Sequence, residues 1–258
     1  MASHALQDPC FTPVASLRQR GEKKLLVDDV YPQIFEAILE QRIAPGSRFT
    51  EDSLGQAFGV SRSIIRQVLA RLAHQQVIIL RPNQRPQVAA PDREQTRQVL
   101  HARCLAENAL VHLACQQPHS RLKPLRELVV REREAIEQHR HGPAIRLSGE
   151  FHLRLAQIAD NAPLARFLGS LVPLTSLAIA QLADRALHPC AWQEHAAIVD
   201  ALLQADTGAA QALMQQHLEH LQLRVLKGLE EQPAASSLSR PASAQTPGGS
   251  SLPAGRRR

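Results

Sequence analysis

The 258-residue sequence has few aromatic residues, few cysteines and no long apolar run. Aromatic residues make up only 3% of the chain, so leucine and alanine must fill most of its core. The four cysteines are too few and too scattered for a disulfide framework or a zinc finger, and reduced thiols are expected. No apolar run reaches about 18 residues, which argues against a membrane span. Because the first 25 residues also lack the apolar region of a signal peptide, we expect a cytoplasmic protein.

Motifs of common catalytic sites are missing as well. The sequence contains neither a G-x-S-x-G nucleophile elbow nor a glycine-rich phosphate loop. Three aspartates, Asp184, Asp200 and Asp206, do not form a recognisable pair of catalytic carboxylates. The sequence therefore gives no positive indication of an enzyme.

The formal net charge of +6 arises at the two ends of the chain. Residues 1–90 hold 11 Lys and Arg against 8 Asp and Glu, whereas residues 233–258 hold four arginines and no acid. Residues 91–232 carry a net charge of −1 and ten of the twelve histidines. We expect residues 1–26 to be a flexible segment and the Pro-, Ala-, Ser- and Gly-rich residues 233–258 to be a disordered basic tail. The basic ends favour an anionic partner.

Residues 27–90 predict a winged helix-turn-helix. Apolar residues recur at helical spacing in three segments, and a glycine-containing turn, Gly59-Val60, separates the second from the third. A β-type run and a return strand beginning at Val88 flank a turn-forming segment and would make a hairpin, the wing. The expected helices span residues 28–42, 51–58 and 61–76, and the expected hairpin spans residues 77–88.

The third of these helices has the features of a recognition helix. Ser61 is expected to cap it, and Arg62 and Arg66 lie four residues apart on one face, beside the short donors Ser61 and Ser63. Each arginine can fork onto guanine or bind a phosphate. The alternative is a small helical module whose arginines are merely solvated. Turn, cap, basic pair and wing agree with one another and favour DNA binding.

Residues 44–89 resemble the winged-helix domain of the GntR transcriptional regulators. The most specific matches are Pro45-Gly46, the run Gly59-Val60-Ser61-Arg62, and Arg66. The resemblance implies that Arg62 and Arg66 contact operator DNA with support from Ser61 and Ser63.

Three positions depart from the family pattern. Ile64 replaces a proline that is common inside the recognition helix, and Gln67 replaces a glutamate, which removes a negative charge near the DNA. Arg85 stands where the wing usually has glycine. An arginine there is expected to reach into the minor groove instead of allowing close backbone approach.

Residues 91–232 predict an antiparallel all-α bundle, so the whole protein is expected to be mainly α. Proline, glycine and asparagine clusters separate the helical segments with short connections. The six expected helices span residues 93–117, 121–139, 143–160, 162–185, 190–205 and 207–231.

Three histidines of the bundle are candidate metal ligands. His152, His195 and His217 each lie within a strongly helical segment, so each could point inward from a different helix. Three converging imidazoles suit a divalent zinc, nickel or manganese ion. The alternative is that they are ordinary hydrogen-bonded core or surface histidines.

The bundle resembles the FCD effector domain of the FadR branch of GntR regulators over about 135 residues. The matching pieces surround His152, His195 and His217 and include Arg103 and Glu107 in the first bundle helix. In metal-binding members the three histidines chelate a divalent cation with a carboxylate four residues before the first. Here that position is Ser148. The site therefore either completes its coordination with water or effector, or has lost its metal.

The sequence allows two interpretations of the role of Arg103. The resemblance suggests that it clamps an effector carboxylate beside the metal. Its spacing from Glu107 instead allows a surface salt bridge.

The sequence as a whole predicts a homodimeric transcriptional regulator that binds an operator in double-stranded DNA. A small organic acid bound in residues 91–232 would control operator binding, and the family resemblance favours repression released by this effector. Two alternatives are a metal-dependent enzyme that uses the three histidines and a metal-free regulator that binds an acyl ligand.

Overall fold

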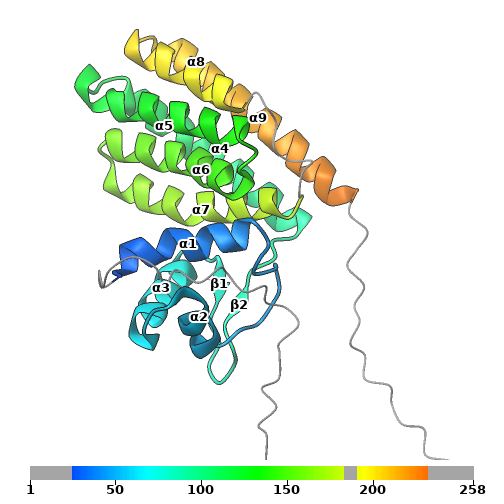
Figure 1. The fold of residues 1–258 in the computed structure, drawn as a ribbon. Helices are drawn as coiled ribbons and strands as arrows, with labels where there is room; N and C mark the ends of the chain where they lie inside the picture. Colours follow the sequence, from blue (N-terminus) through cyan, green and yellow to red (C-terminus); the bar gives the residue numbers. More distant parts are fainter. Residues whose placement is uncertain (1–24, 183–190, 232–258) are drawn as a thin grey trace, which may run out of the picture.

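The computed structural model describes residues 25–182 and 191–231. The expected disordered tail 233–258 and most of the expected N-terminal segment 1–26 lie outside the described residues. Within the described ranges the chain forms nine helices and one two-stranded sheet (Figure 1). The mainly α fold expected from the sequence is confirmed.

Residues 25–90, called the head below, form a winged helix-turn-helix. Helix α3 is followed by an antiparallel hairpin in which Ile78 pairs with Val88, and the hairpin closes the wing. Apolar side chains of all three helices and both strands form one core. The elements are α1 (Val27–Leu39), α2 (Glu51–Phe58), α3 (Arg62–His74), β1 (Ile78–Ile79) and β2 (Gln87–Val88).

The turn between α2 and α3 follows from its residues. The Thr50 side chain accepts a hydrogen bond from the Ser53 backbone N–H at 3.0 Å and caps α2. Gly59 ends the helix with φ +67°, in the left-handed region that glycine enters without strain. Ser61 occupies the position before α3, but its side chain makes no capping hydrogen bond, contrary to expectation.

The bundle consists of six helices that pack in a closed ring in the order α4, α9, α8, α5, α6, α7. Its apolar core is built mainly from leucine, alanine and valine, as the low aromatic content requires. Closing the ring encloses an interior into which five of the helices send polar side chains. The helices are α4 (Arg93–Ala114), α5 (His119–Glu137), α6 (His141–Ile158), α7 (Ala162–Ala180), α8 (Ala191–Leu203) and α9 (Thr207–Glu230).

Helix α6 begins earlier than the sequence suggests. The sequence predicted a helix from residue 143, but His141 and Gly142 also belong to α6 and form its first turn with Pro143. A proline is tolerated there because the first-turn N–H groups have no helical partner. The preceding turn contains His139, with φ +53°.

Helix α7 meets the length and composition of a membrane-crossing helix, contrary to the expectation from uninterrupted apolar runs. Its best 18-residue window has a mean hydropathy of 1.4, and half of that window is buried in the structure. Because α7 packs against α4, α6 and α1, it occupies the position of a core helix, and its apolar composition is weak evidence for a membrane segment.

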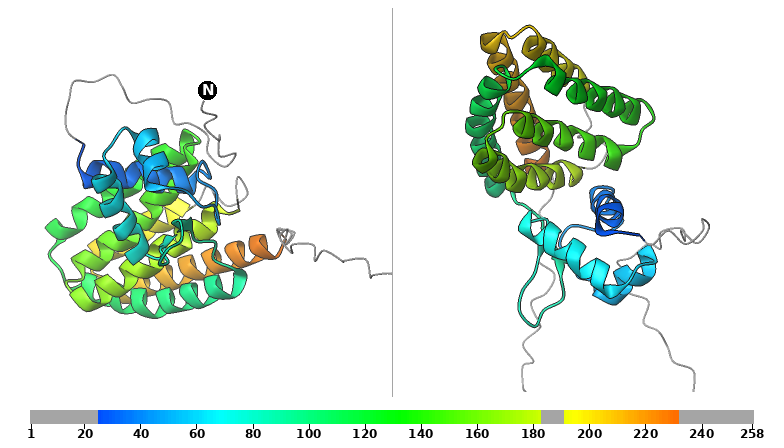
Figure 2. Two further views of the ribbon diagram at one scale, coloured as in Figure 1. Left: turned by 90° about the horizontal axis from the view of Figure 1, so that it is seen from below. Right: turned by 90° about the vertical axis from the view of Figure 1, so that its left-hand side faces the viewer.

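The head is joined to the bundle by a shared apolar core. Ile145 of α6 and Leu177 and Ala180 of α7 pack with the core residues of the head. Gly142 allows the closest approach, because a Cβ atom there would lie 2.5 Å from Cγ of Glu40. The right-hand view of Figure 2 shows α1 lying between the bundle and the rest of the head.

Replacing Gly59 with alanine is expected to destabilise the protein. The added Cβ meets no atom within 4 Å, so the cost is the strain of the left-handed backbone alone, about 1–2 kcal/mol. The matched control is Gly169→Ala in α7, where a Cβ also has free space but the backbone is helical, and a small stabilisation is expected. Urea unfolding measures both changes, and equal effects would contradict this account.

Candidate functional site

The exposed face of α3 carries the two arginines expected to contact DNA. The Arg62 side chain is 65% exposed and its Nε lies 2.6 Å from a carboxylate oxygen of Asp52. The Arg66 side chain is 71% exposed and donates two hydrogen bonds to Glu51, at 3.1 and 2.8 Å. Both acids belong to the first turn of α2. The two carboxylates therefore hold both guanidinium groups at the protein surface, where phosphate groups of DNA can replace them as ion-pair partners.

Three further expected contacts flank these arginines. Ser61 and Ser63 are exposed at the start of α3, and within the described residues no hydrogen bond of either hydroxyl is recorded. Arg85 is exposed in the loop between β1 and β2. The start of the recognition helix and the wing thus present side-chain donors to solvent, as a DNA-reading surface requires.

The double substitution Arg62→Ala and Arg66→Ala is expected to abolish retention of operator DNA, because each lost contact costs about 1–3 kcal/mol. A gel-shift assay with the DNA upstream of the protein's own gene measures this retention. The matched control is Arg126→Ala on α5, since Arg126 has similar exposure and a similar ion pair, 2.7 Å from Asp200. Retention by the double variant would reject α3 as the reading helix.

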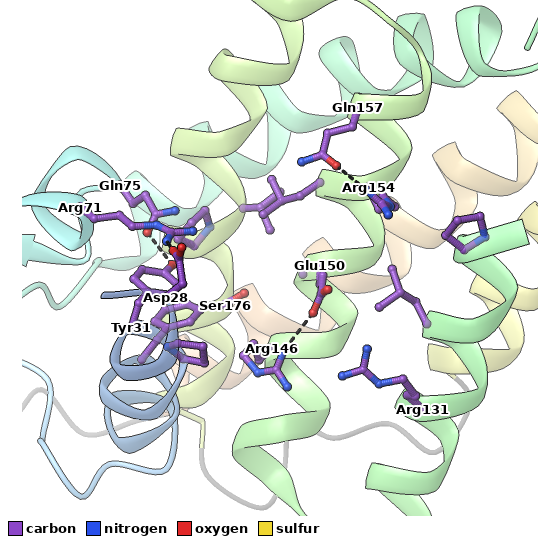
Figure 3. A pocket seen from close by; sticks show the side chains of 18 of the residues that line it. Asp28, Tyr31, Arg71, Gln75, Arg131, Arg146, Glu150, Arg154, Gln157 and Ser176 are labelled. Carbon is purple, nitrogen blue, oxygen red and sulfur yellow. Dashed lines mark hydrogen bonds and ion pairs between the residues drawn. The ribbon is translucent and has the colours of Figure 1, made fainter. Parts of the chain in front are cut away.

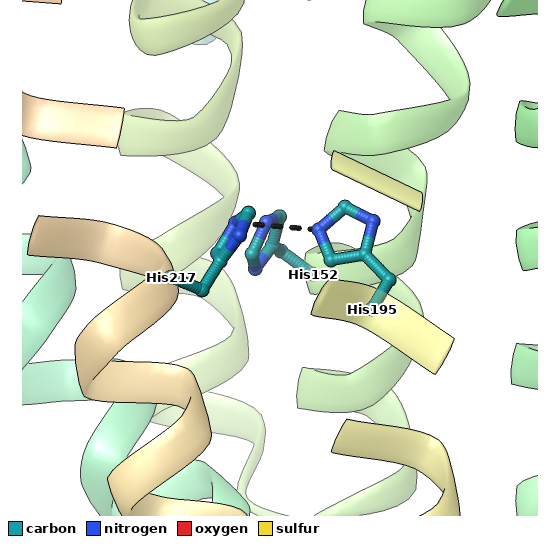
Figure 4. Close-up of side chains that lie close together, drawn as sticks. All are labelled: His152, His195 and His217. Atoms are coloured by element: carbon teal, nitrogen blue, oxygen red, sulfur yellow. Dashed lines mark hydrogen bonds between the residues drawn. The ribbon is translucent and has the colours of Figure 1, made fainter. Parts of the chain in front are cut away.

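The three candidate metal ligands converge inside the bundle. His152 of α6, His195 of α8 and His217 of α9 are each at most 2% exposed. One ring nitrogen from each lies within 4.8 Å of the others, and Figure 4 shows the three rings turned toward one another. The Nε2 atoms of His195 and His217 are 3.3 Å apart. These residues are called the histidine cluster below.

Each histidine of the cluster is hydrogen-bonded through Nδ1 to a glutamate from another helix. His152 pairs with Glu107 at 2.5 Å, and His195 pairs with Glu132 at 2.7 Å. His217 pairs with Glu194 at 2.7 Å. Carboxylates in this position fix the tautomer and orientation of histidines that ligate metals.

Burial keeps two of the imidazoles neutral at neutral pH. It lowers the pKa of His152 to about 4 against the opposing effect of Glu107. Burial and the nearby His195 lower the pKa of His217 to about 3. Burial alone would raise the pKa of Glu107, but Arg103 and His152 overcome this and lower it to about 2. Neutral imidazoles beside ionised carboxylates are the state in which histidine binds a metal.

The geometry of the cluster suits a bound cation. An ionised carboxylate only accepts hydrogen bonds, so the neutral rings of His152 and His217 hold their protons on Nδ1, toward Glu107 and Glu194. The Nε2 atoms of His195 and His217 face each other at 3.3 Å. Two imidazole nitrogens on one tetrahedral zinc ion are about 3.4 Å apart, given Zn–N bonds of about 2.1 Å. The donor set therefore fits a divalent ion.

The charges around the cluster also favour a bound cation. The hydrogen-bonded set contains three carboxylates and one guanidinium, that of Arg103, a net formal charge of −2. A divalent cation would neutralise it. The ring of Phe151 stacks on His195 with centroids 4.2 Å apart and holds that imidazole in its orientation.

Arg103 is buried, which corrects the expectation of a surface salt bridge. It is 2% exposed, and its Nε lies 2.7 Å from Glu107, which is 0% exposed. The same glutamate binds His152, so a continuous chain of hydrogen bonds joins Arg103 to the cluster. One guanidinium nitrogen of Arg103 is buried without a partner. This orphaned donor is a position at which an anion would be stabilised.

Among the residues that the structure describes, no carboxylate takes the place of the one missing at Ser148. Ser148 is half-buried on α6, and the cluster found within the described residues contains only the three histidines. Glu150 instead binds Arg146 at 2.9 Å and faces a different cavity. A smaller cavity of about 280 Å³ borders His217 and Glu194 between α8 and α9.

Sequence reasoning missed the glutamates. Glu132 was not singled out, and Glu107 and Glu194 were part of the family resemblance without a role beside the histidines. Glu132 lies in the charged run Arg131–Glu134, which is typical of a solvated face, yet it is 1% exposed. Of the three, only Glu194 had a local signal, since it directly precedes His195.

The metal-free protein is expected to lose stability on acidification. The pKa values of His152 and His217 in the folded state, about 4 and about 3, lie below the value of about 6.5 in an unfolded chain. The unfolded chain therefore binds more protons, and the stabilisation present above about pH 6.5 is lost as the pH falls toward 4. Urea unfolding of chelator-treated protein measures the slope, which His217→Gln should reduce. A constant stability from pH 7 to 4.5 would contradict the prediction.

Comparisons with known proteins agree with the two-part architecture. Residues 26–88 match the family model of bacterial regulatory proteins of the gntR family, and residues 98–220 match the FCD domain. A Uxu operon regulator from Haemophilus influenzae is 25% identical over 236 residues, covering 82% of this chain and 87% of the relative. An HTH-type transcriptional repressor, RspR, from Escherichia coli is 26% identical over 194 residues, covering 74% and 85%.

Solved structures share the fold. The Escherichia coli protein McbR/YncC superposes with a TM-score of 0.67 at 18% identity, covering 80% of this chain and 99% of that chain. A GntR transcriptional regulator from Rhodococcus sp. gives a TM-score of 0.64 at 22% identity, covering 78% and 97%.

The matches define the protein as a DNA-binding transcriptional regulator and not an enzyme. More closely, the chain belongs to the GntR family and combines its DNA-binding domain with an FCD domain, as in FadR-type regulators.

Proposed function

We propose that the protein is a homodimeric repressor that acts in the cytoplasm and releases its operator when a small organic acid binds beside a divalent metal. Residues 27–90 serve as the DNA-binding domain, and residues 91–232 serve as the effector-binding and dimerisation domain. The observation that carries the proposal is the histidine cluster, in which three buried imidazoles from three helices each place one ring nitrogen within 4.8 Å of the others.

Operator recognition is assigned to Ser61, Arg62, Ser63 and Arg66 at the start of α3, with Arg85 of the wing as a minor-groove contact. The support is the exposure of both recognition-helix arginines, at 65% and 71%, and their exchangeable ion pairs with α2. A dimer would present two such heads to the two halves of a palindromic site. The repressor assignment is supported by the relative RspR, which is named a repressor.

A divalent zinc, nickel or manganese ion is assigned to His152, His195 and His217. When bound, the ion supplies a Lewis-acid centre that attracts carboxylate oxygens. The glutamates keep the Nδ1 protons in place, and Phe151 keeps His195 oriented. With serine at position 148, no carboxylate of α6 competes with the effector for that centre.

The effector is assigned to the class of small carboxylates. The unpartnered guanidinium nitrogen of Arg103 offers a hydrogen bond to a second acidic group. The cavity beside His217 supplies a route from solvent toward the cluster. For regulation, the effector must bind one arrangement of the two heads better than the other.

Metal binding is tested by removal and return of the ion. Adding zinc, nickel or manganese to chelator-treated protein is expected to raise the melting temperature by several degrees, because a ligand at a hundred times its Kd stabilises by about 2.7 kcal/mol. His217→Ala should abolish the response. Elemental analysis before and after chelation reports the metal content directly.

The matched control for this experiment is His220→Ala. His220 also hydrogen-bonds Glu194, at 2.8 Å, but it is 46% exposed and lies outside the cluster. It should therefore retain the metal response. A protein that contains no metal as purified and shows no metal-dependent change in melting would reject the site and leave the metal-free acyl-binding alternative.

A further inference from the structure

A second cavity lies between the head and the bundle. It has a volume of about 580 Å³, within the range of pockets for small molecules. Helices α1 and α3 of the head form one wall, and α5, α6 and α7 form the other (Figure 3). None of the lining residues belongs to the histidine cluster. This cavity is called the interdomain cleft below.

Two of the four arginines in the interdomain cleft are already neutralised. Arg71 of α3 lies 2.9 Å from Asp28, and its guanidinium covers the Tyr31 ring at 4.0 Å. Arg146 of α6 binds both Glu36 of the head, at 2.5 Å, and Glu150. Both guanidinium groups already have carboxylate partners, so Arg71 and Arg146 are poor candidates for binding another anion.

The other two arginines have no acidic partner within the described ranges. Arg154 of α6 donates only to the amide oxygen of Gln157, at 3.0 Å. Arg131 of α5 makes no recorded hydrogen bond or ion pair there, although Glu127 is one turn away. Figure 3 shows the Arg131 guanidinium pointing from α5 into the cleft. Two neighbouring helices thus each supply to one cavity an arginine that has no ion-pair partner among the described residues.

The remaining lining selects the kind of ligand. Tyr31 and Phe35 stack on each other with centroids 5.9 Å apart and give the head wall an aromatic surface. The charged lining residues are four arginines and three acids, a net formal charge of only +1. A polyanion such as nucleic acid would meet those acids, whereas a small anion can occupy the space between the free arginines.

We propose that the interdomain cleft binds a small organic anion. Arg131 and Arg154 bind its carboxylate or phosphate group, and its body lies against Tyr31 and Phe35. Because the ligand contacts both walls, its affinity depends on the position of the head relative to the bundle. By linkage, bound anion restrains the head and changes operator affinity independently of the histidine cluster.

The test uses full-length, chelator-treated protein with succinate and inorganic phosphate as probes of the two anionic groups. Isothermal titration calorimetry is expected to show saturable binding of at least one probe. The double variant Arg131→Gln and Arg154→Gln should weaken it by about tenfold or more, since hydrogen bonds to charged groups are among the strongest in proteins. The probe that binds more tightly identifies the dicarboxylate or the phosphorylated class.

Matched variants make the result specific. Arg121→Gln removes an exposed arginine of the same helix α5 that does not line the cleft, and it should bind as the wild type does. His217→Ala should also retain binding, which separates this site from the metal centre. Because both cleft arginines are exposed, unchanged urea unfolding of the double variant is expected. Equal affinity of the double variant and wild type, or no saturable binding of either probe, would overturn the proposal.

Discussion

Three glutamate–histidine pairs, two of them fully buried and the third partly buried, impose the strictest constraint on this structure. Each joins different parts of the helical ring: Glu107 and His152 link α4 to α6, Glu132 and His195 link α5 to α8, and Glu194 and His217 link α8 to α9. A buried carboxylate is costly without a partner, so the helices must keep a register that brings every pair together. The leucine-rich packing around them supplies burial, but it is compatible with many registers. The glutamate–histidine pairs can all form in only one register of the helices.

How much of this could be read from the sequence depends on whether the signal was local. Gly59, the spacing of Arg62 and Arg66, and the hairpin after α3 are contained in a few consecutive residues, and the winged helix was predicted from them. The periodicity of residues 91–231 predicted the helices, with errors of one or two residues at most ends. The histidine cluster was a hypothesis that the family resemblance strengthened. Its convergence depends on histidines that lie 22 to 65 residues apart in the sequence, and periodicity cannot show which helices pack together.

The glutamates and the interdomain cleft were beyond the reach of such reasoning. Glu132 and Arg103 look like surface residues in sequence because charge is usually solvated, and only the packing of α4 and α5 against the ring interior buries them. The cleft is formed by helices from both halves of the chain. The cleft exists because the head packs against α6 and α7, and the position of this packing has no signal in the local sequence.

The shared core between head and bundle has a consequence for how such proteins diversify. Because Ile145, Leu177 and Ala180 complete the apolar core of the head, cutting the chain after the wing would expose part of that core to solvent. A chimera that joins this head to the bundle of a relative would have to import α6 and the end of α7 with a compatible surface, Gly142 included. The packing surface between head and bundle therefore limits which heads and bundles can be combined. The linker that connects β2 to α4 does not set this limit.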